Sequence, residues 1–202
     1  MKIAVLAWGS LIWDQGQLEV GSPFAPDGPH LPIEFCRVSG QNAAPRRLTL
    51  VIDEAIGADC LTYSAQSGLD NLDLALTNLW MREGSEGEKH PKKIRKSGRV
   101  AFVDLTTGTE SETAVLLHPA AVQTIRAWAK AKTYDAVIWT ALGSNFGEPA
   151  AAGEAFSVEA AVRFLEGRSD DQREVALTYI RNAPPEVKTP VRDAVTARWP
   201  QG

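Results

Sequence analysis

The chain has 202 residues, 44% of them hydrophobic and 23% charged, which suits one sizeable soluble domain or one domain with an appendage. Its net charge of −4 argues against a protein built mainly to coat nucleic acid or an anionic membrane. Two cysteines, Cys36 and Cys60, are too few for a disulfide scaffold, so we expect two reduced, buried thiols.

The N-terminal segment opens with an apolar run that predicts a buried strand over residues 3–7. Lys2 before such a run resembles the start of a signal peptide. However, Gly9-Ser10 interrupts the run, and Asp14 follows with no small-residue cleavage site. No stretch approaches the roughly 18 apolar residues of a membrane span. We therefore expect a cytoplasmic protein with no membrane partner.

Strands and turns dominate the first third of the chain. Apolar runs bounded by turn residues are typical of strands, and the Gly- and Pro-rich stretch 14–32 is typical of a loop. Beyond Gly68 the period changes, and leucines recur at helical spacing until Gly84 and Gly87. Strands are predicted over residues 3–7, 33–39, 47–53 and 59–64, a helix over 68–84, and a basic, polar loop from there to residue 98.

The rest of the chain passes from strands to helices. Apolar runs at residues 100–105 and 114–118, joined through Thr106-Thr107-Gly108, predict a β-hairpin. Because consecutive strands lack intervening helices, an α+β class with an antiparallel or mixed sheet is favoured over a doubly wound fold. The remaining predicted elements are a helix from Pro119, a strand within 134–142, a loop over 143–153, and helices beginning at Ser157, at Asp170 or Asp171, and at Thr189.

One carboxylate continues the apolar face of the helix predicted over 68–84. At about 100° per residue, four leucines of this helix share a face, and Glu83 extends it. Burial disfavours a charged carboxylate, so we expect a raised pKa for Glu83, and such a group can take and give a proton near pH 7. The alternative is that the helix ends near Arg82 and Glu83 frays into solvent or pairs with an arginine. The leucines are Leu69, Leu72, Leu76 and Leu79.

The break at Gly9-Ser10, between Trp8 and Leu11, is the second informative feature. Small residues let a backbone approach a ligand closely, and N–H groups released from strand pairing can bind a carboxylate or a developing oxyanion. The alternative is a bulge or turn with no ligand. The segment is not a nucleophile elbow, since G-x-S-x-G is absent, and no G-x-G-x-x-G opens a helix here.

Together the two features resemble one known family. "AWGSLIWD" resembles the Y-G-S-L signature of the gamma-glutamylcyclotransferase-like family, especially the Y-G-S-L-I-W form of its glutathione-degrading branch. "LALTNLWMREGS" resembles the helix in which L-x-x-R-E ends in the catalytic glutamate, and "RRLTLVIDEAIGADCLTYSA" resembles the strands before it. The order and spacing match over about residues 3–118, and the chain departs from the family by placing Trp8 where the family has tyrosine.

The resemblance implies a mixed β-barrel with flanking helices over residues 1–152 and a C-terminal helical extension over 153–202. It also implies an enzyme that converts a small gamma-glutamyl compound into 5-oxoproline and a free amine without a cofactor or metal. Carried over by position, Glu83 is the general acid/base, and Trp8, Gly9, Ser10 and Leu11 form the substrate-binding loop.

Several basic residues can either bind a ligand or simply lie in solvent. Arg46 and Arg47 can hold a substrate carboxylate or can be solvated strand ends, and Arg47 is taken as a substrate-binding residue. A basic run can bind RNA, form a lid beside Glu83 that attracts acidic peptides, or be a solvated loop. Nucleic-acid binding is not expected, because the run lacks stacking aromatics. The run contains Lys89, His90, Lys92, Lys93, Arg95, Lys96 and Arg99.

The remaining candidates are weaker. The histidines have no metal-ligand spacing to the cysteines, and a Cys–His nucleophile pair stays an open alternative. Trp139 and Asn145 can line a pocket, although a core position is favoured for Trp139. The unmapped region 134–202 and the change at Trp8 also leave open a non-catalytic protein that binds a small molecule or a partner, as a monomer or homodimer.

Overall fold

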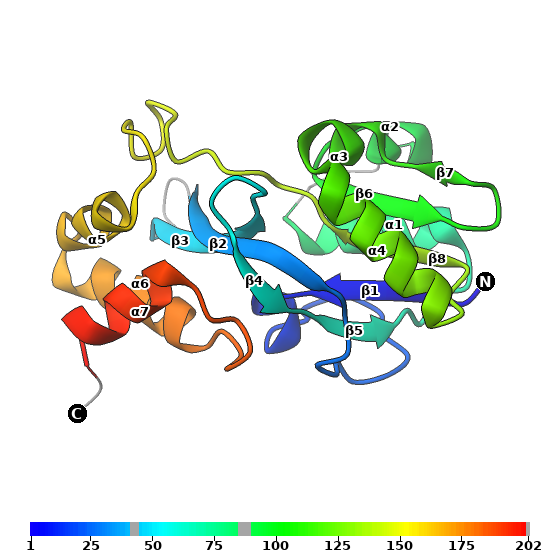
Figure 1. The fold of residues 1–202 in the computed structure, drawn as a ribbon, viewed down its shortest axis with the longest axis horizontal. Helices are drawn as coiled ribbons and strands as arrows, with labels where there is room; N and C mark the ends of the chain where they lie inside the picture. The colour runs from blue at the N-terminus through cyan, green and yellow to red at the C-terminus, as the bar shows by residue number, and fades with distance from the viewer. Residues whose placement is uncertain (41–44, 85–89, 201–202) are drawn as a thin grey trace. The chain divides into compact units, whose positions relative to one another are not determined.

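The computed structural model describes residues 1–40, 45–84 and 90–200. In this part of the chain there are seven α-helices, one turn of 3₁₀ helix and eight strands, and the strands form two separate sheets (Figure 1). The α+β class is therefore confirmed. The expected closed barrel is not: over the described residues one sheet has five strands and the other three, and neither closes on itself.

Contacts within the chain divide it into two compact units. The first contains Met1–Leu31 and Leu61–Leu142, and the second contains Pro32–Cys60 and Gly143–Gly202. The strands between residues 32 and 60 belong to the same unit as the C-terminal helices, and α6 packs on β3 within it, while a division at residues 152 and 153 stays a prediction.

The first unit is built on the five-stranded sheet, in the order β5-β1-β8-β6-β7. The N-terminal strand β1 lies inside this sheet, antiparallel to β5 and parallel to β8. All five residues of β1 are buried, as expected for a central strand covered on both faces. The strands are β1 (Ile3–Ala7), β5 (Tyr63–Gln66), β6 (Val100–Asp104), β7 (Thr109–Glu110) and β8 (Ala136–Thr140).

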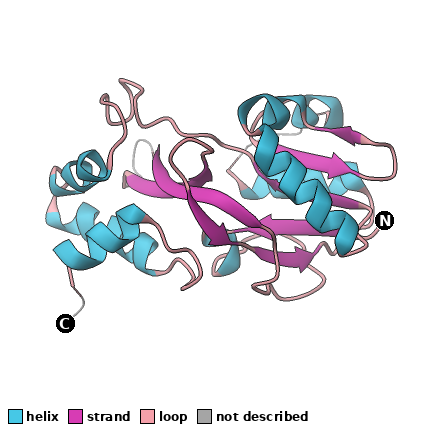
Figure 2. Ribbon diagram, viewed as in Figure 1, coloured by secondary structure: helices cyan, strands magenta, loops and turns pink. Residues whose placement is uncertain are grey.

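Helices cover both faces of this sheet. In the view of Figure 2, α4 (Pro119–Ala131) lies in front of the strands and α1 (Leu72–Arg82) behind them, and both contact β6 and β8. The Asn71 side chain starts α1 by accepting hydrogen bonds from the Asp73 and Leu74 N–H groups at 3.0 and 3.1 Å.

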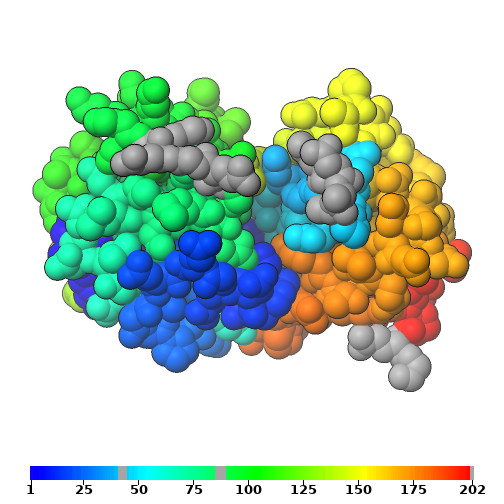
Figure 3. Space-filling model, turned by 180° about the vertical axis from the view of Figure 1, so that it is seen from behind, coloured from blue at the N-terminus to red at the C-terminus, as the bar shows by residue number. Residues whose placement is uncertain are grey.

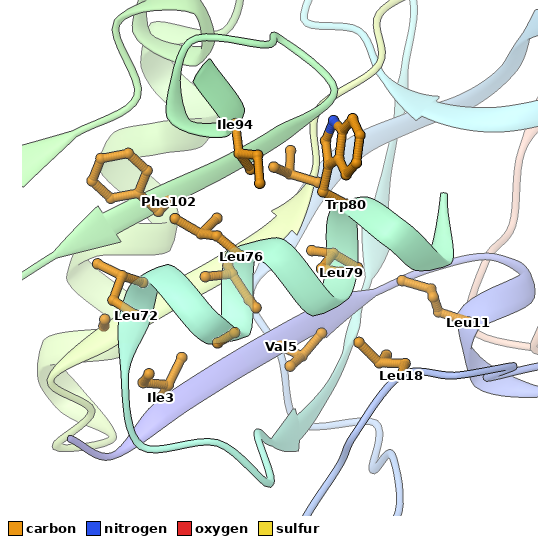
Figure 4. Packing of buried hydrophobic residues seen from close by; sticks show 14 of the residues in the cluster. Ile3, Val5, Leu11, Leu18, Leu72, Leu76, Leu79, Trp80, Ile94 and Phe102 are labelled. Atoms are coloured by element: carbon orange, nitrogen blue, oxygen red, sulfur yellow. The ribbon is translucent and has the colours of Figure 1, made fainter. Parts of the chain in front are cut away.

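The predicted leucine face of α1 packs on β1. Leu72 lies near Ile3, and the last turn of α1 lies near Leu11 and Leu18 (Figure 4). Ile94, from the short helix α2 (Pro91–Arg95), and Trp80 are buried in the same cluster. This packing fixes the direction of α1, so the carboxyl ends of α1 and β1 lie at the same edge of the sheet.

The second unit combines the sheet β3-β2-β4 with three C-terminal helices. Helix α6 packs against β3, and the ring of Tyr179 meets that of Phe35 edge-on at 6.5 Å. The Asn145 side chain accepts a hydrogen bond from the Val38 N–H and donates one to the Val38 carbonyl, as a neighbouring strand would. The elements are β2 (His30–Ser39), β3 (Arg47–Ile52), β4 (Ala58–Leu61), α5 (Val158–Glu166), α6 (Asp170–Arg181) and α7 (Pro190–Arg198).

Two predicted segments are wrong in type. Residues 114–118 are not a strand, because α3 spans Glu112–Leu117 and the hairpin partner of β6 is β7. A short apolar run has no period that separates strand from helix, and Leu116 is 82% exposed in α3. The predicted basic loop contains α2, whose first turn His90 caps with its side chain. Gly87 and Lys89 lie outside the described residues.

Candidate active site

Four segments of the first unit meet at the carboxyl end of β1. β8 runs parallel to β1, and extending the register from Val5 opposite Ile138 brings Thr140 level with Ala7. On its other side, Thr140 pairs with Val100 at the start of β6. The last turn of α1 ends at the same edge (Figure 4). Segments far apart in the sequence therefore converge here.

The Trp8–Leu11 segment leaves the strand and enters the 3₁₀ turn Ser10–Ile12. The side chains of Trp8 and Leu11 are buried, whereas Gly9 and Ser10 are half-buried. Within the described part of the chain, neither the Ser10 nor the Leu11 N–H donates a hydrogen bond. The segment thus offers a ligand its backbone donors, while the indole of Trp8 belongs to the interior.

Glu83 is the residue that follows the last residue of α1. The helix ends at Arg82 and Glu83 forms an ion pair with that arginine, as the alternative interpretation holds, yet the Glu83 side chain is only 17% exposed. The Glu83 N–H donates to the Leu79 carbonyl at 3.1 Å. Its own carbonyl accepts from Arg99 Nη1 at 2.9 Å. Bonds on both sides of the residue hold it in place at the helix end, with most of the side chain shielded from water.

The surroundings of Glu83 change its acidity. Burial raises the pKa of the carboxyl above its ordinary value, and the Arg82 charge, the Thr140 hydroxyl and the Arg99 charge oppose that rise only in part. Thr140 Oγ1 is itself buried and has no hydrogen bond of regular geometry among the described residues. A carboxyl group in these surroundings is suited to exchange a proton with a bound ligand.

Arg82 links the two sequence motifs directly. Its Nη1 lies 3.7 Å from Glu83 Oε1, and its Nη2 lies 3.5 Å from Ser10 Oγ. The same guanidinium donates to the Asp14 and Gln15 carbonyls at 2.5 and 3.2 Å. In Figure 3 the blue N-terminal residues lie directly against the blue-green residues around α1. The structure therefore brings Gly9, Ser10 and Leu11 to the helix end that carries Glu83.

Arg47 belongs to the second unit. Its guanidinium carbon lies 5.0 Å from the centre of the Tyr179 ring. The neighbouring Arg46 donates to the carbonyls of Ala150 and Ala151. Arg47 as a substrate-binding residue stays a prediction. The cluster also contains Arg99, which the sequence marks only as part of the basic run, and Thr140, which has no sequence signal, because the long-range pairing of the strands brings both to Glu83.

The other sequence candidates have structural positions. Burial raises the pKa of the Cys36 thiol to about 12, which disfavours the thiolate that a nucleophile needs. Trp139 is buried, in agreement with the core position favoured for it. Across residues 1–40, 45–84 and 90–200, no group of three or more His, Cys, Asp and Glu side chains is placed to hold a metal ion. Of the helices described, none is long and apolar enough to cross a membrane.

Comparisons with protein-family models, with curated proteins and with solved structures find no match to this chain.

Proposed function

We propose that this protein is a gamma-glutamylcyclotransferase-like enzyme that cleaves a small gamma-glutamyl compound into 5-oxoproline and a free amine. The observation that carries the proposal is the shielded Glu83 carboxyl, whose pKa is raised, next to the opened Gly9-Ser10-Leu11 backbone. The proposal includes a fold similar to that family in the first unit, with the strand, the open loop and the glutamate-bearing helix in the order of the resemblance.

Glu83 acts as a shuttle for a single proton in the proposed reaction. As the neutral α-amino nitrogen of the substrate bonds to its γ-carbonyl carbon, the Glu83 carboxylate takes the proton from that nitrogen. As the bond from this carbon to the leaving nitrogen breaks, Glu83 gives the same proton to the leaving nitrogen. The attack is intramolecular, so holding the substrate in a folded conformation supplies much of the rate.

The Gly9–Leu11 backbone supplies the binding part of the proposal. The Ser10 and Leu11 N–H groups are the donors for the charged end of the gamma-glutamyl group. Because this role needs only backbone atoms, the replacement of the family tyrosine by the buried Trp8 is compatible with it. The chemistry needs no metal and no cofactor.

The test is the release of 5-oxoproline from glutathione, a gamma-glutamyl amino acid and a gamma-glutamyl isopeptide. We expect Glu83→Gln to fold normally and to lose activity about 10³-fold, since general acid–base catalysis contributes roughly 10²- to 10⁴-fold. Glu112→Gln is the matched control, because Glu112 is an exposed residue of α3 in the same unit. Full activity in Glu83→Gln would exclude the assigned role.

The same assay separates catalysis from binding. If no compound yields 5-oxoproline while the wild-type protein is folded, the proposal is wrong. Thermal stabilisation of the protein by one of these compounds in that case would favour the alternative of a non-catalytic small-molecule binder.

A further inference from the structure

We infer that Arg82 is a positioning residue that locks the Trp8–Gln15 segment onto the end of α1 beside Glu83. Arg82 precedes Glu83 in the chain, but its side chain is directed mainly to the N-terminal loop. The inference rests on the proposed function for its catalytic consequence and on contacts alone for its structural part.

The contacts of Arg82 are specific to a guanidinium. Nη2 donates to the Asp14 carbonyl, Nε donates to the Gln15 carbonyl, and Ser10 Oγ lies at the limit of hydrogen-bonding distance from Nη2. A lysine has a single terminal nitrogen and cannot match donors spread over this fork. The side chain is only 15% exposed, so these contacts are largely shielded from competition with water.

The loop is shaped around this side chain. Gly16 has a φ of +55°, a conformation that favours glycine. A Cβ atom at position 16 would lie 3.1 Å from Arg82 Cδ and 3.4 Å from Arg82 Nε. A glycine that both permits the turn and leaves room for the arginine indicates that the loop and the guanidinium fit together as one arrangement.

The fourth contact of Arg82 is electrostatic. The 3.7 Å separation between Arg82 Nη1 and Glu83 Oε1 is an ion pair that is too long for a hydrogen bond, so the Glu83 oxygens keep their capacity to accept a substrate proton. The groups that face the Glu83 carboxyl are Arg82 from α1, Arg99 before β6 and Thr140 from β8. Arg82 thus holds the binding loop and favours the ionised form of the carboxylate at the same time.

Two variants separate these effects. Arg82→Met removes both the charge and the loop contacts, whereas Arg82→Lys keeps the charge and loses most of the donors. Arg95→Met is the matched control, because the contacts that the described residues give Arg95 are with Asp73 at the other end of α1 and with the Phe102 ring. We would measure the pH dependence of kcat/KM, the titration of the Glu83 carboxyl by NMR, and hydrogen exchange over residues 9–16.

We expect Arg82→Met to lower kcat/KM on the order of 10- to 100-fold, since small displacements of a reacting group have effects of this size. Its acid limb should move to higher pH, because the lost positive charge no longer favours the Glu83 carboxylate. In Arg82→Lys the limb should stay in place while exchange over residues 9–16 speeds up. Arg95→Met should change neither the limb nor that exchange.

Exchange over residues 9–16 at the wild-type rate in Arg82→Lys would overturn the inference, and so would a Glu83 titration in Arg82→Met identical to wild type. If the wild-type protein releases no 5-oxoproline, the proposed function fails by itself. The exchange and titration measurements then still decide whether Arg82 holds the loop and acts on Glu83.

Discussion

Among the described residues, burial raises the pKa of one carboxyl group in each unit, Glu34 in the second and Glu83 in the first, and the two groups differ in their partners. In the second unit, Glu34 is 1% exposed and accepts hydrogen bonds from the Phe35 N–H at 2.7 Å and the Val191 N–H at 3.4 Å. The Thr189 hydroxyl opposes the rise in the pKa of Glu34 in part, as the Thr140 hydroxyl does for Glu83. In the first unit, Glu83 keeps 17% of its side chain exposed, and Arg82 approaches it without a hydrogen bond.

Burial alone therefore does not identify a catalytic carboxyl. The Glu34 oxygens are occupied by the start of α7 and by its own strand, so the group joins two elements and has no access to a ligand. The Glu83 carboxyl is shielded but keeps 17% of its side chain exposed, and the Arg82 guanidinium links it to the segment whose Ser10 and Leu11 N–H groups bond no described residue. The hydrogen bonds that the carboxylate oxygens already accept thus distinguish Glu34, the structural carboxyl, from Glu83, the candidate catalytic carboxyl.

Removal of the Glu34 carboxyl should destabilise the protein more than any other change considered, and it tests the structural role given to Glu34. Glu34→Ala would leave the buried Phe35 and Val191 N–H groups unsatisfied, each at a cost of roughly 1–3 kcal/mol, and would open a cavity. We expect the free energy of unfolding to fall by about 3 kcal/mol, measured by urea denaturation. A loss below about 0.5 kcal/mol, as for an exposed residue, would contradict the assigned role of Glu34.

The pH dependence of stability gives a second test of Glu34. Its pKa is raised by burial in the folded state, so the folded protein binds this proton more tightly than the unfolded chain does. The resulting stabilisation is complete below the ordinary value of 4.5 and is lost as the pH rises through the folded-state pKa. Relative to Glu34→Gln, the wild-type protein should therefore become less stable over that window. A constant difference between the two proteins would show that Glu34 titrates alike in both states.

The third prediction tests the surroundings of Glu83. Gly16→Ala forces an L residue into φ +55° and presses its Cβ against Arg82, so we expect about 1–2 kcal/mol of destabilisation and a lower kcat/KM. Gly108→Ala is the control, because Gly108 has a φ of +72° and nothing within 4 Å of its added Cβ. It should cost similar stability without a change in kcat/KM. The same kcat/KM in the two variants would show that Gly16 does not affect the surroundings of Glu83.

The smallest effect is expected from Thr140→Val, which keeps the shape of the side chain and removes its hydroxyl. Stability should change by less than about 0.5 kcal/mol, because Oγ1 makes no regular hydrogen bond among the described residues. The acid limb of kcat/KM should move to higher pH, since the hydroxyl no longer favours the Glu83 carboxylate. An unchanged limb would remove Thr140 from the group of residues that tune Glu83.

Local patterns predicted most elements, and the errors have physical reasons. The leucine spacing of α1 and the apolar run of β1 each depend on one period, and both elements lie where expected. The run at 114–118 was assigned to a strand because its apolar residues carry no period, whereas Glu112 starts a helix there. The division into two units could not be read from composition, because it depends on the packing of α6 on β3.

The candidate site was predictable only as far as the two motifs extend. Glu83 and the Gly9–Leu11 backbone were selected from the sequence, and Arg82 brings them together. Thr140 carries no local signal and Arg99 is marked only as part of a basic run, because both reach Glu83 only when β8 inserts between β1 and β6. Long-range strand pairing leaves no pattern within a short window of sequence.

The parallel pairing of β1 with β8 also has a consequence for the order in which the molecule is completed. Ile3 pairs with Ala136, so β1, the first strand of its unit in chain order, completes its pairing only with one of the last segments of that unit. Closing so long a loop lowers the conformational entropy of the chain before the stabilising contacts between the strands form. Such topologies therefore fold slowly. A growing chain that has not yet reached residue 136 holds an apolar strand with one unpaired edge, the type of surface on which chains aggregate and chaperones act.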